Sequence, residues 1–135
     1  MTDATNELVV VETADGLRRL IDRLAPEPRI ALDTEANSLH AFRERVCVVQ
    51  LSAPGLDAIV DPLVVPDLDP LRDLVDRDDV EVVFHGGDYD VTMLSRERGF
   101  RFRRVFDTMI AATLLGDPKV GLAALVEAAH GVVLS

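Results

Sequence analysis

The sequence predicts an α/β fold in which a mixed β-sheet, with three antiparallel strands followed by parallel strands, is flanked by helices. Three short β-type runs come first, at residues 30–34, 46–51 and 56–60, and short links join them as in an antiparallel meander. The apolar period then changes, and helical segments alternate with a further strand. This order is typical of a sheet with helices packed on it. A chain of 135 residues corresponds to one domain with a sizeable core.

The amino-terminal part predicts a strand, a helix and the meander. Residues 8–11 form a short β-type run, and Thr13 then offers an N-cap. The apolar positions of the following helix recur at helical spacing until two prolines end the pattern: Leu17, Leu20, Ile21 and Leu24, then Pro26 and Pro28. Pro54 and Gly55 supply the turn between the second and third strands of the meander.

The carboxyl-terminal part alternates helices with a strand. The apolar positions after Pro66 predict a helix: Leu68, Leu71, Leu74 and Val75. Residues 80–84 are apolar and β-branched, which indicates a strand, and the turn at residues 85–87 leads into a helix through Leu94. Two further helices are predicted, one over residues 107–115 and one from about Gly121.

Composition bounds the class of protein. The chain is 48% hydrophobic and 28% charged, with a net charge of −10, which indicates a globular protein and argues against generic nucleic-acid binding. A local basic patch, or divalent cations, can still supply the positive charge. No apolar run approaches the roughly 18 residues of a membrane span, so we expect no membrane partner. The acidic start and the lone Cys47 indicate a cytoplasmic protein.

The first candidate site lies at the end of the strand predicted at residues 30–34. Asp33 and Glu35 are two residues apart, so in a strand their side chains project from the same face. Neighbouring carboxylates raise each other's pKa unless a cation lies between them, and their hard oxygen atoms suit Mg²⁺ or Mn²⁺. The alternative is a solvated strand exit without function.

The second candidate site follows the strand at residues 80–84. That strand ends at His85, two glycines allow a tight turn, and Asp88 or Asp90 then lies in the first turn of a helix. Acids there also complement the helix dipole, which is a sufficient structural explanation for one of them. If the strand neighbours residues 30–34, one of these acids comes close to Asp33 and Glu35.

Two further features admit structural explanations. Asp107 is predicted to cap the helix that follows it rather than to act in catalysis. Five arginines within nine positions form the most basic stretch of an acidic chain and are the place to look for a bound phosphate backbone: Arg96, Arg98, Arg101, Arg103 and Arg104. The histidines are expected to lie at the surface or to be hydrogen-bonded, with His85 at a strand end. No metal-binding Cys/His spacing, nucleophile elbow or phosphate-binding loop is present in the sequence.

Three stretches together resemble the ribonuclease D branch of the DEDD 3'-5' exonucleases. IALDTEANSLHAFRERVCVVQLS is similar to the first exonuclease motif of that family, VVFHGGDYDVTML to the second, and VFDTMIAATLLG with VGLAALVE to the helices that follow. The resemblance covers the chain from about Ile30 onward and implies a ribonuclease H-like fold. Three blocks in the right order are far more specific than any one of them.

The resemblance implies a metal-dependent exonuclease site. Asp33 and Glu35 match the first two family carboxylates, and Asp90 matches the third, with Asp88 as the second choice. These acids would hold two divalent cations, Mg²⁺ or Mn²⁺, and the substrate would be a single-stranded RNA 3' end. The resemblance also suggests that Leu39 and His40 grip the terminal nucleotide. Because they are basic, Arg101 and Arg103 are predicted to contact the substrate.

The sequence departs from the family pattern in one respect. The family has a fourth aspartate with a tyrosine four residues before it, and neither has a counterpart in residues 1–135. We therefore expect residues 1–135 to be the amino-terminal part of a single exonuclease domain, with little or no turnover. Two alternatives are a catalytically inactive domain that binds nucleic acid or protein and an exonuclease that acts on DNA. The sequence does not predict the oligomeric state.

Overall fold

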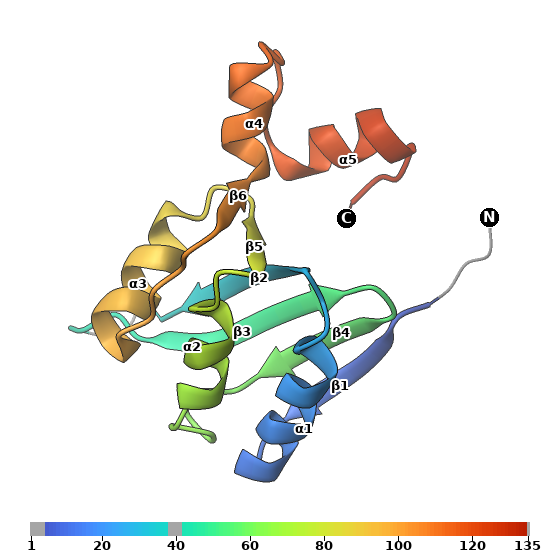
Figure 1. Ribbon diagram of the computed structural model, residues 1–135. Helices are drawn as coiled ribbons and strands as arrows, with labels where there is room; N and C mark the ends of the chain where they lie inside the picture. Colours follow the sequence, from blue (N-terminus) through green and yellow to red (C-terminus); the bar gives the residue numbers. More distant parts are fainter. Residues whose placement is uncertain (1–4, 38–41, 135) are drawn as a thin grey trace.

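A six-stranded sheet forms the centre of the molecule. The computed structural model describes residues 5–37 and 42–134 (Figure 1). The strands are β1 (Glu7–Val11), β2 (Arg29–Ala36), β3 (Val46–Ala53), β4 (Leu56–Val60), β5 (Glu81–Phe84) and β6 (Val105–Asp107). Their order across the sheet is β1-β4-β3-β2-β5-β6. Strand β2 therefore lies between the antiparallel and the parallel parts of the sheet.

The strand pairing confirms the predicted mixed sheet. Strands β2, β3 and β4 pair antiparallel as the predicted meander, and β5 and β6 extend the sheet parallel to β2. Strand β1 pairs parallel with β4 at the other edge. Strand β6 was not predicted from the sequence, because it has three residues, and two of them, Val105 and Phe106, are about half exposed. Such a short edge strand has too few positions to show an alternating pattern.

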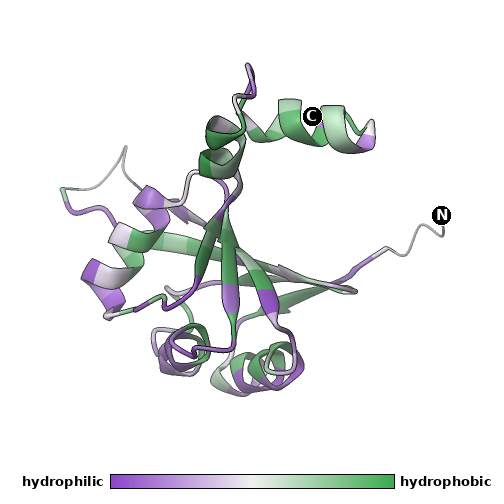
Figure 2. Cartoon of the chain, turned by 45° about the horizontal axis from the view of Figure 1, so that its top comes forward, coloured by the Kyte–Doolittle hydropathy of each residue, from purple (hydrophilic) through white to green (hydrophobic). Residues whose placement is uncertain are grey.

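Three helices cover one face of the sheet (Figures 1 and 2). They are α1 (Ala14–Leu24), α2 (Asp69–Val75) and α3 (Asp88–Arg98). Each has buried apolar residues in a single core with alternate residues of the strands. Burial of this apolar surface is the main force that holds the helices on the sheet. The predicted cap of α1 is confirmed, since the Thr13 side chain accepts a hydrogen bond from the Gly16 backbone N–H at 2.9 Å.

The last two helices pack little against the rest of the chain. Helices α4 (Thr108–Leu114) and α5 (Leu122–His130) project beyond the sheet (Figure 1), and α5 has no buried residue. Figure 2 shows hydrophobic colouring over much of both helices. Apolar side chains are exposed on these helices, beside them and on the segment that follows: Met109, Ile110, Leu114, Leu115, Leu122, Val132, Val133 and Leu134. No helix in the described part of the chain is long and apolar enough to cross a bilayer.

The turn between β5 and α3 depends on its two glycines. Gly86 has a φ of 65°, in the left-handed region that favours glycine. Gly87 has an ordinary φ of −80°, but a Cβ at this position would lie 2.5 Å from the Cβ of the buried Phe84. No side-chain rotation relieves that overlap, since the atom it meets is fixed to the β5 backbone.

We expect Gly87→Ala to lower the free energy of unfolding by about 2 kcal/mol, because backbone or core atoms must shift to admit the methyl group. Urea denaturation followed by circular dichroism measures the change. Gly121→Ala is the control, since its added methyl group meets no atom within 4 Å at an ordinary φ of −67°. Equal losses in the two variants would show that the β5–α3 turn is not sterically constrained.

Candidate active site

The alternation of β2 determines where its two acids project. Ile30, Leu32 and Thr34 are buried against the helices, whereas Asp33 and Glu35 project from the opposite, solvent-exposed face. The pairing of β2 with β3 shifts register between Glu35 and Ala36. Irregularities of this kind bend a strand and re-aim side chains, and they are frequent beside functional sites.

The parallel pairing of β2 and β5 brings the second candidate acid to the same place. Ala31 is aligned with Val83, so β5 ends beside Leu32 and the chain turns into α3 at the level of the β2 acids. In the first turn of α3, Asp90 is buried, with 6% of its surface exposed, while Asp88 is exposed. The structure therefore places Asp90, rather than Asp88, against β2.

Thr34 fixes the carboxylate of Asp90. One oxygen, Oδ1, accepts a hydrogen bond from the Thr34 backbone N–H at 2.9 Å and another from the Thr34 hydroxyl at 2.5 Å. The backbone N–H is free for this bond because β5 ends before it reaches Thr34. The other oxygen, Oδ2, makes no hydrogen bond within residues 5–37 and 42–134. Asp90 is thus held at the edge of β2 beside Thr34, the residue that lies between Asp33 and Glu35 in the chain.

The pKa of Asp33 reports the crowding of these acids. Partial desolvation of its carboxyl group is the largest cause that raises this pKa above the ordinary value, although the residue faces solvent. The negative charges of Asp90 and Glu35 raise the pKa further, and a hydrogen bond with the Thr34 backbone opposes them. The charges of Glu35 in the same strand and of Asp90 in a distant part of the chain therefore both act on Asp33, as the hypothesis of a shared site requires.

The acids fit a hard divalent cation in donor type and in charge. Carboxylate oxygens are the ligands that Mg²⁺ and Mn²⁺ prefer, and a cation would remove the repulsion that raises the pKa of Asp33. Within the part of the chain that the structure describes, no three acidic, histidine or cysteine side chains already surround a common point where one metal ion could be held. The role of Asp33, Glu35 and Asp90 as metal ligands remains a prediction.

A groove on the solvent-exposed face of the sheet contains Asp33. Its volume is ≈ 570 Å³, and its lining includes Asp33, Gln50 and His85. His85 is the hydrogen-bonded strand end that was predicted, since its Nδ1 lies 2.8 Å from the Thr108 hydroxyl. That hydroxyl donates to the Phe84 carbonyl at 3.2 Å, so it accepts from a protonated Nδ1, which leaves Nε2 of a neutral His85 as an acceptor.

Asp107 is a structural residue, as predicted. Its carboxylate caps α4 by accepting from the backbone N–H groups of Met109 and Ile110, at 2.9 and 3.2 Å. It also accepts from the N–H groups of Gly86 and Gly87, at 3.0 and 2.8 Å. Asp107 therefore ties the turn that leads to Asp90 to the start of α4.

The remaining predicted substrate contacts do not join the acids. Arg103 donates to the Asp76 carboxylate at 3.0 Å, and Arg101 lies 3.8 Å from the same group. Asp76 precedes the first residue of β5 in the chain. Asp90 follows the other end of that strand, so the two arginines lie at the far end of the sheet from the acids. Their contact with substrate remains a prediction that the geometry does not favour. Leu39 and His40 lie outside the described residues.

Two residues that contribute to the site were not predicted from the sequence. Thr34 was assigned no role, although its position between two acids implied that it faces the helices and could meet a group on α3. Arg45 was also missed, because it lies far in the sequence from the arginine cluster at residues 96–104. Its backbone N–H donates to the Asn37 side chain at 2.7 Å, two residues after Glu35.

Comparison with known proteins gives one consistent result. The family model described as 3'-5' exonuclease matches residues 8–135. A ribonuclease D from Sphingobium indicum is 38% identical over 128 residues, which is 93% of this chain and 33% of that protein. The exosome complex component 10 homolog of Drosophila melanogaster is 34% identical over 125 residues, which is 92% of this chain and 14% of that protein.

Solved structures agree on the fold. The catalytic core of RRP6 from Trypanosoma brucei superimposes with a TM-score of 0.93 and 30% identity, over 100% of this chain and 38% of that one. Ribonuclease D from Escherichia coli gives a TM-score of 0.86 and 28% identity, over 97% of this chain and 35% of that one. The predicted ribonuclease H-like fold is thereby confirmed. The chain spans about a third or less of the length of these curated relatives.

Proposed function

The chain belongs to the 3'-5' exonuclease family, and from this membership we propose that it forms part of a ribonuclease D-type enzyme that hydrolyses phosphodiester bonds at RNA 3' ends. The observation that supports the proposal is the position of Asp90 against Thr34, the residue between Asp33 and Glu35, where the charges of Asp90 and Glu35 both act on Asp33. RNA is the proposed substrate because relatives that are 30% or more identical are named as ribonucleases D.

All three acids have a proposed role as metal ligands. Exonucleases of this family generally depend on divalent metal ions, and we propose two, Mg²⁺ or Mn²⁺. Asp33 and Glu35 would hold them from the exposed face of β2, and Asp90 would contribute the oxygen that Thr34 leaves free. When bound, such ions lower the pKa of the attacking water and stabilise the leaving oxygen. Thr34 acts through Asp90, by holding its carboxylate in one orientation.

Hydrolysis by residues 1–135 alone is expected to be weak, because the fourth aspartate and the tyrosine of the family pattern are not among them. We expect a chimera that continues from residue 135 into the corresponding remainder of the Sphingobium indicum ribonuclease D to release mononucleotides. The measurement uses Mn²⁺ and a 3'-labelled single-stranded RNA.

Two controls separate the possible outcomes. Asp33→Asn in the chimera is expected to reduce the rate at least about 100-fold, since loss of even an outer-shell partner of a metal site costs 10–100-fold. Full activity of this variant would contradict the site assignment. A deoxyribonucleotide strand of the same sequence tests the alternative that the substrate is DNA, and preferential hydrolysis of that strand would replace RNA as the proposed substrate.

A catalytically inactive binding domain is the second candidate. One observation favours it: within residues 5–37 and 42–134, no group of acids is already arranged around a metal position. This candidate predicts that the chimera binds single-stranded RNA but does not hydrolyse it in Mn²⁺ or Mg²⁺.

The cytoplasm is the proposed location. Cys47 is the single cysteine of the sequence, and it is unpaired and half-buried. A chain without an internal disulfide is suited to a reducing compartment. Fractionation of cells that express a tagged chain tests this location.

A further inference from the structure

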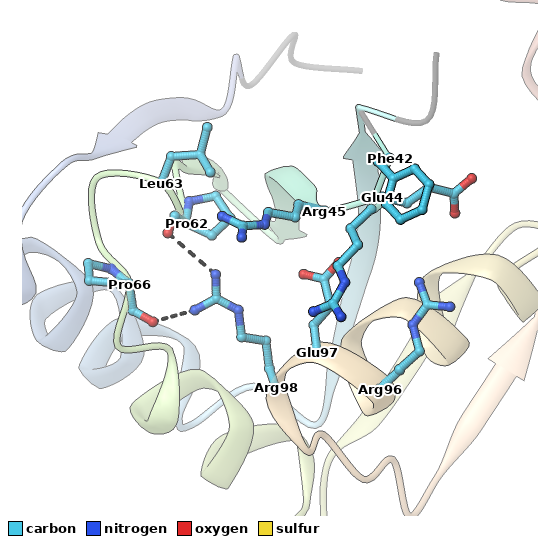
Figure 3. A pocket seen from close by; sticks show the side chains of 10 residues that line it. Phe42, Glu44, Arg45, Pro62, Leu63, Pro66, Arg96, Glu97 and Arg98 are labelled. Atoms are coloured by element: carbon cyan, nitrogen blue, oxygen red, sulfur yellow. Dashed lines mark hydrogen bonds between the residues drawn. The ribbon is translucent and has the colours of Figure 1, made fainter. Parts of the chain in front are cut away.

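A second, basic pocket is lined by other residues than the groove that contains Asp33. Its volume is ≈ 950 Å³, and it lies between the segment that precedes β3, the link from β4 to α2, and the end of α3 (Figure 3). Four arginines line it: Arg43, Arg45, Arg96 and Arg98. We call it the arginine pocket. It combines arginines from two segments about fifty residues apart, so no single stretch of sequence reveals it.

The arginines of this pocket differ in their pairing from all the others except Arg19. Eight arginines elsewhere form ion pairs with acids within 4 Å: Arg18, Arg23, Arg29, Arg72, Arg77, Arg101, Arg103 and Arg104. None of the four pocket arginines forms an ion pair with another described residue. Unpaired positive charge is therefore concentrated here, in a chain whose net charge is −10. Such a local excess attracts anions.

The two glutamates that line the pocket have partners of their own. Both carboxylate oxygens of Glu97 lie 3.2 Å from the Val46 backbone nitrogen, and Glu44 accepts from the Tyr89 hydroxyl at 3.0 Å. Arg98 has a structural role, since its guanidinium donates to the carbonyls of Pro62 and Pro66 (Figure 3). One guanidinium nitrogen of Arg96 donates to the Met93 sulfur at 3.0 Å. The Arg43 and Arg45 side chains bond to no other described residue, so these two and the remaining N–H groups of Arg96 are available for a ligand.

An exposed aromatic residue at the rim indicates the class of ligand. Phe42 is fully exposed and lines the same pocket as Glu44 and Arg96 (Figure 3). An aromatic ring exposed next to unpaired arginines is the combination with which proteins bind single-stranded nucleic acid, since bases stack on the ring and phosphates pair with the cations. An acidic peptide would use the arginines but would gain nothing from the exposed ring.

The arginine pocket is connected to the acid site through the backbone. Asn37, two residues after Glu35, donates its N–H to the Arg45 carbonyl at 3.1 Å and accepts from the Arg45 N–H. Tyr89, which bonds to Glu44, directly precedes Asp90. A single-stranded nucleic acid whose 3' end lies at the acids would therefore reach the pocket within a short length of its own backbone.

We propose that the arginine pocket binds the phosphates of a single-stranded nucleic acid upstream of its 3' end, with Phe42 stacked on a base. The direction of the strand rests on the proposed exonuclease function, whereas binding in the pocket does not. Arg43, Arg45 and Arg96 contact the phosphates, and Arg98 holds the wall of the pocket in place.

The test is fluorescence anisotropy of a labelled single-stranded RNA with the 135-residue chain, in EDTA so that no metal contributes. The triple variant Arg43→Gln, Arg45→Gln, Arg96→Gln is expected to bind at least tenfold more weakly. The slope of log affinity against log salt concentration should become shallower by about 2, because each of the three lost phosphate contacts contributes roughly 0.7. Phe42→Ala is expected to weaken binding about tenfold with an unchanged slope, and Phe42→Tyr to restore it.

The matched control removes the same charge elsewhere, with Arg18→Gln, Arg19→Gln and Arg23→Gln on α1. Equal losses in the two triple variants would overturn the proposal, because binding would then follow net charge only. The absence of measurable RNA binding, or stronger binding of an acidic peptide in competition, would also overturn it. Pocket-dependent binding together with a chimera that does not hydrolyse RNA would leave the pocket established and reject the exonuclease function.

Discussion

Replacing Asp107 with alanine is expected to lower the free energy of unfolding by about 3 kcal/mol. Loss of an N-cap costs about 1 kcal/mol, and each partly buried N–H group left without an acceptor adds about 1 kcal/mol or more. Four backbone N–H groups lose their acceptor, two in α4 and two in the turn before α3. Urea denaturation at pH 7 measures the loss.

The effect should depend on pH in a defined direction. Burial raises the pKa of Asp107, but the four backbone N–H groups outweigh it, so the pKa in the folded protein is below the ordinary value. An acid with a depressed pKa stabilises the fold above its unfolded pKa of about 3.9, and this contribution disappears as the pH falls through the folded pKa. The difference between wild type and Asp107→Ala should therefore narrow below about pH 4.

Asp117→Ala is the control for this prediction, since Asp117 is exposed and its side chain bonds to no other described residue. It should change stability by less than about 0.5 kcal/mol. A loss for Asp107→Ala no larger than that of the control would show that Asp107 does not join the β5–α3 turn to α4.

Replacing Asp33 with asparagine is expected to have opposite effects with and without metal. The folded pKa of Asp33 is raised, so its charge destabilises the metal-free fold above that pKa, and removing the charge should raise the melting temperature at pH 7. Mn²⁺ at 100 times its dissociation constant should stabilise the wild-type chain by about 2.7 kcal/mol. At the same Mn²⁺ concentration, the variant should gain almost nothing, because its affinity is expected to fall at least about 100-fold.

Thermal unfolding with and without Mn²⁺ measures both effects. The metal-free gain should vanish as the pH falls below about 3.9, where Asp33 is protonated in both the folded and the unfolded chain. Asp88→Asn is the matched control, since it removes the same charge from an exposed acid two residues from Asp90. If Asp88→Asn abolished the effect of Mn²⁺ and Asp33→Asn did not, the assignment of ligands would be wrong.

Most of the elements follow from local patterns in the sequence. The helical spacing of Leu17, Leu20 and Leu24 predicts α1, because only one face of that helix can be buried. The alternation of β2 places Asp33 and Glu35 on one face without any knowledge of the rest of the fold, since side chains in a strand alternate. Asp107 could be predicted to be a cap because an N-cap side chain bonds to backbone N–H groups two and three residues later in the chain.

Contacts between distant segments could not be obtained in this way. Local patterns left both Asp88 and Asp90 open, and the family resemblance ranked Asp90 first. The contact of Asp90 with Thr34 depends on the position of α3 relative to β2, which packing of the core determines. The same packing pairs Arg103 with Asp76 and brings Arg45 to the arginine pocket with Arg96. Local charge, the spacing of apolar residues and helix capping are properties of a few neighbouring residues. The contacts of a side chain with distant segments depend instead on how apolar surface is buried along the whole chain.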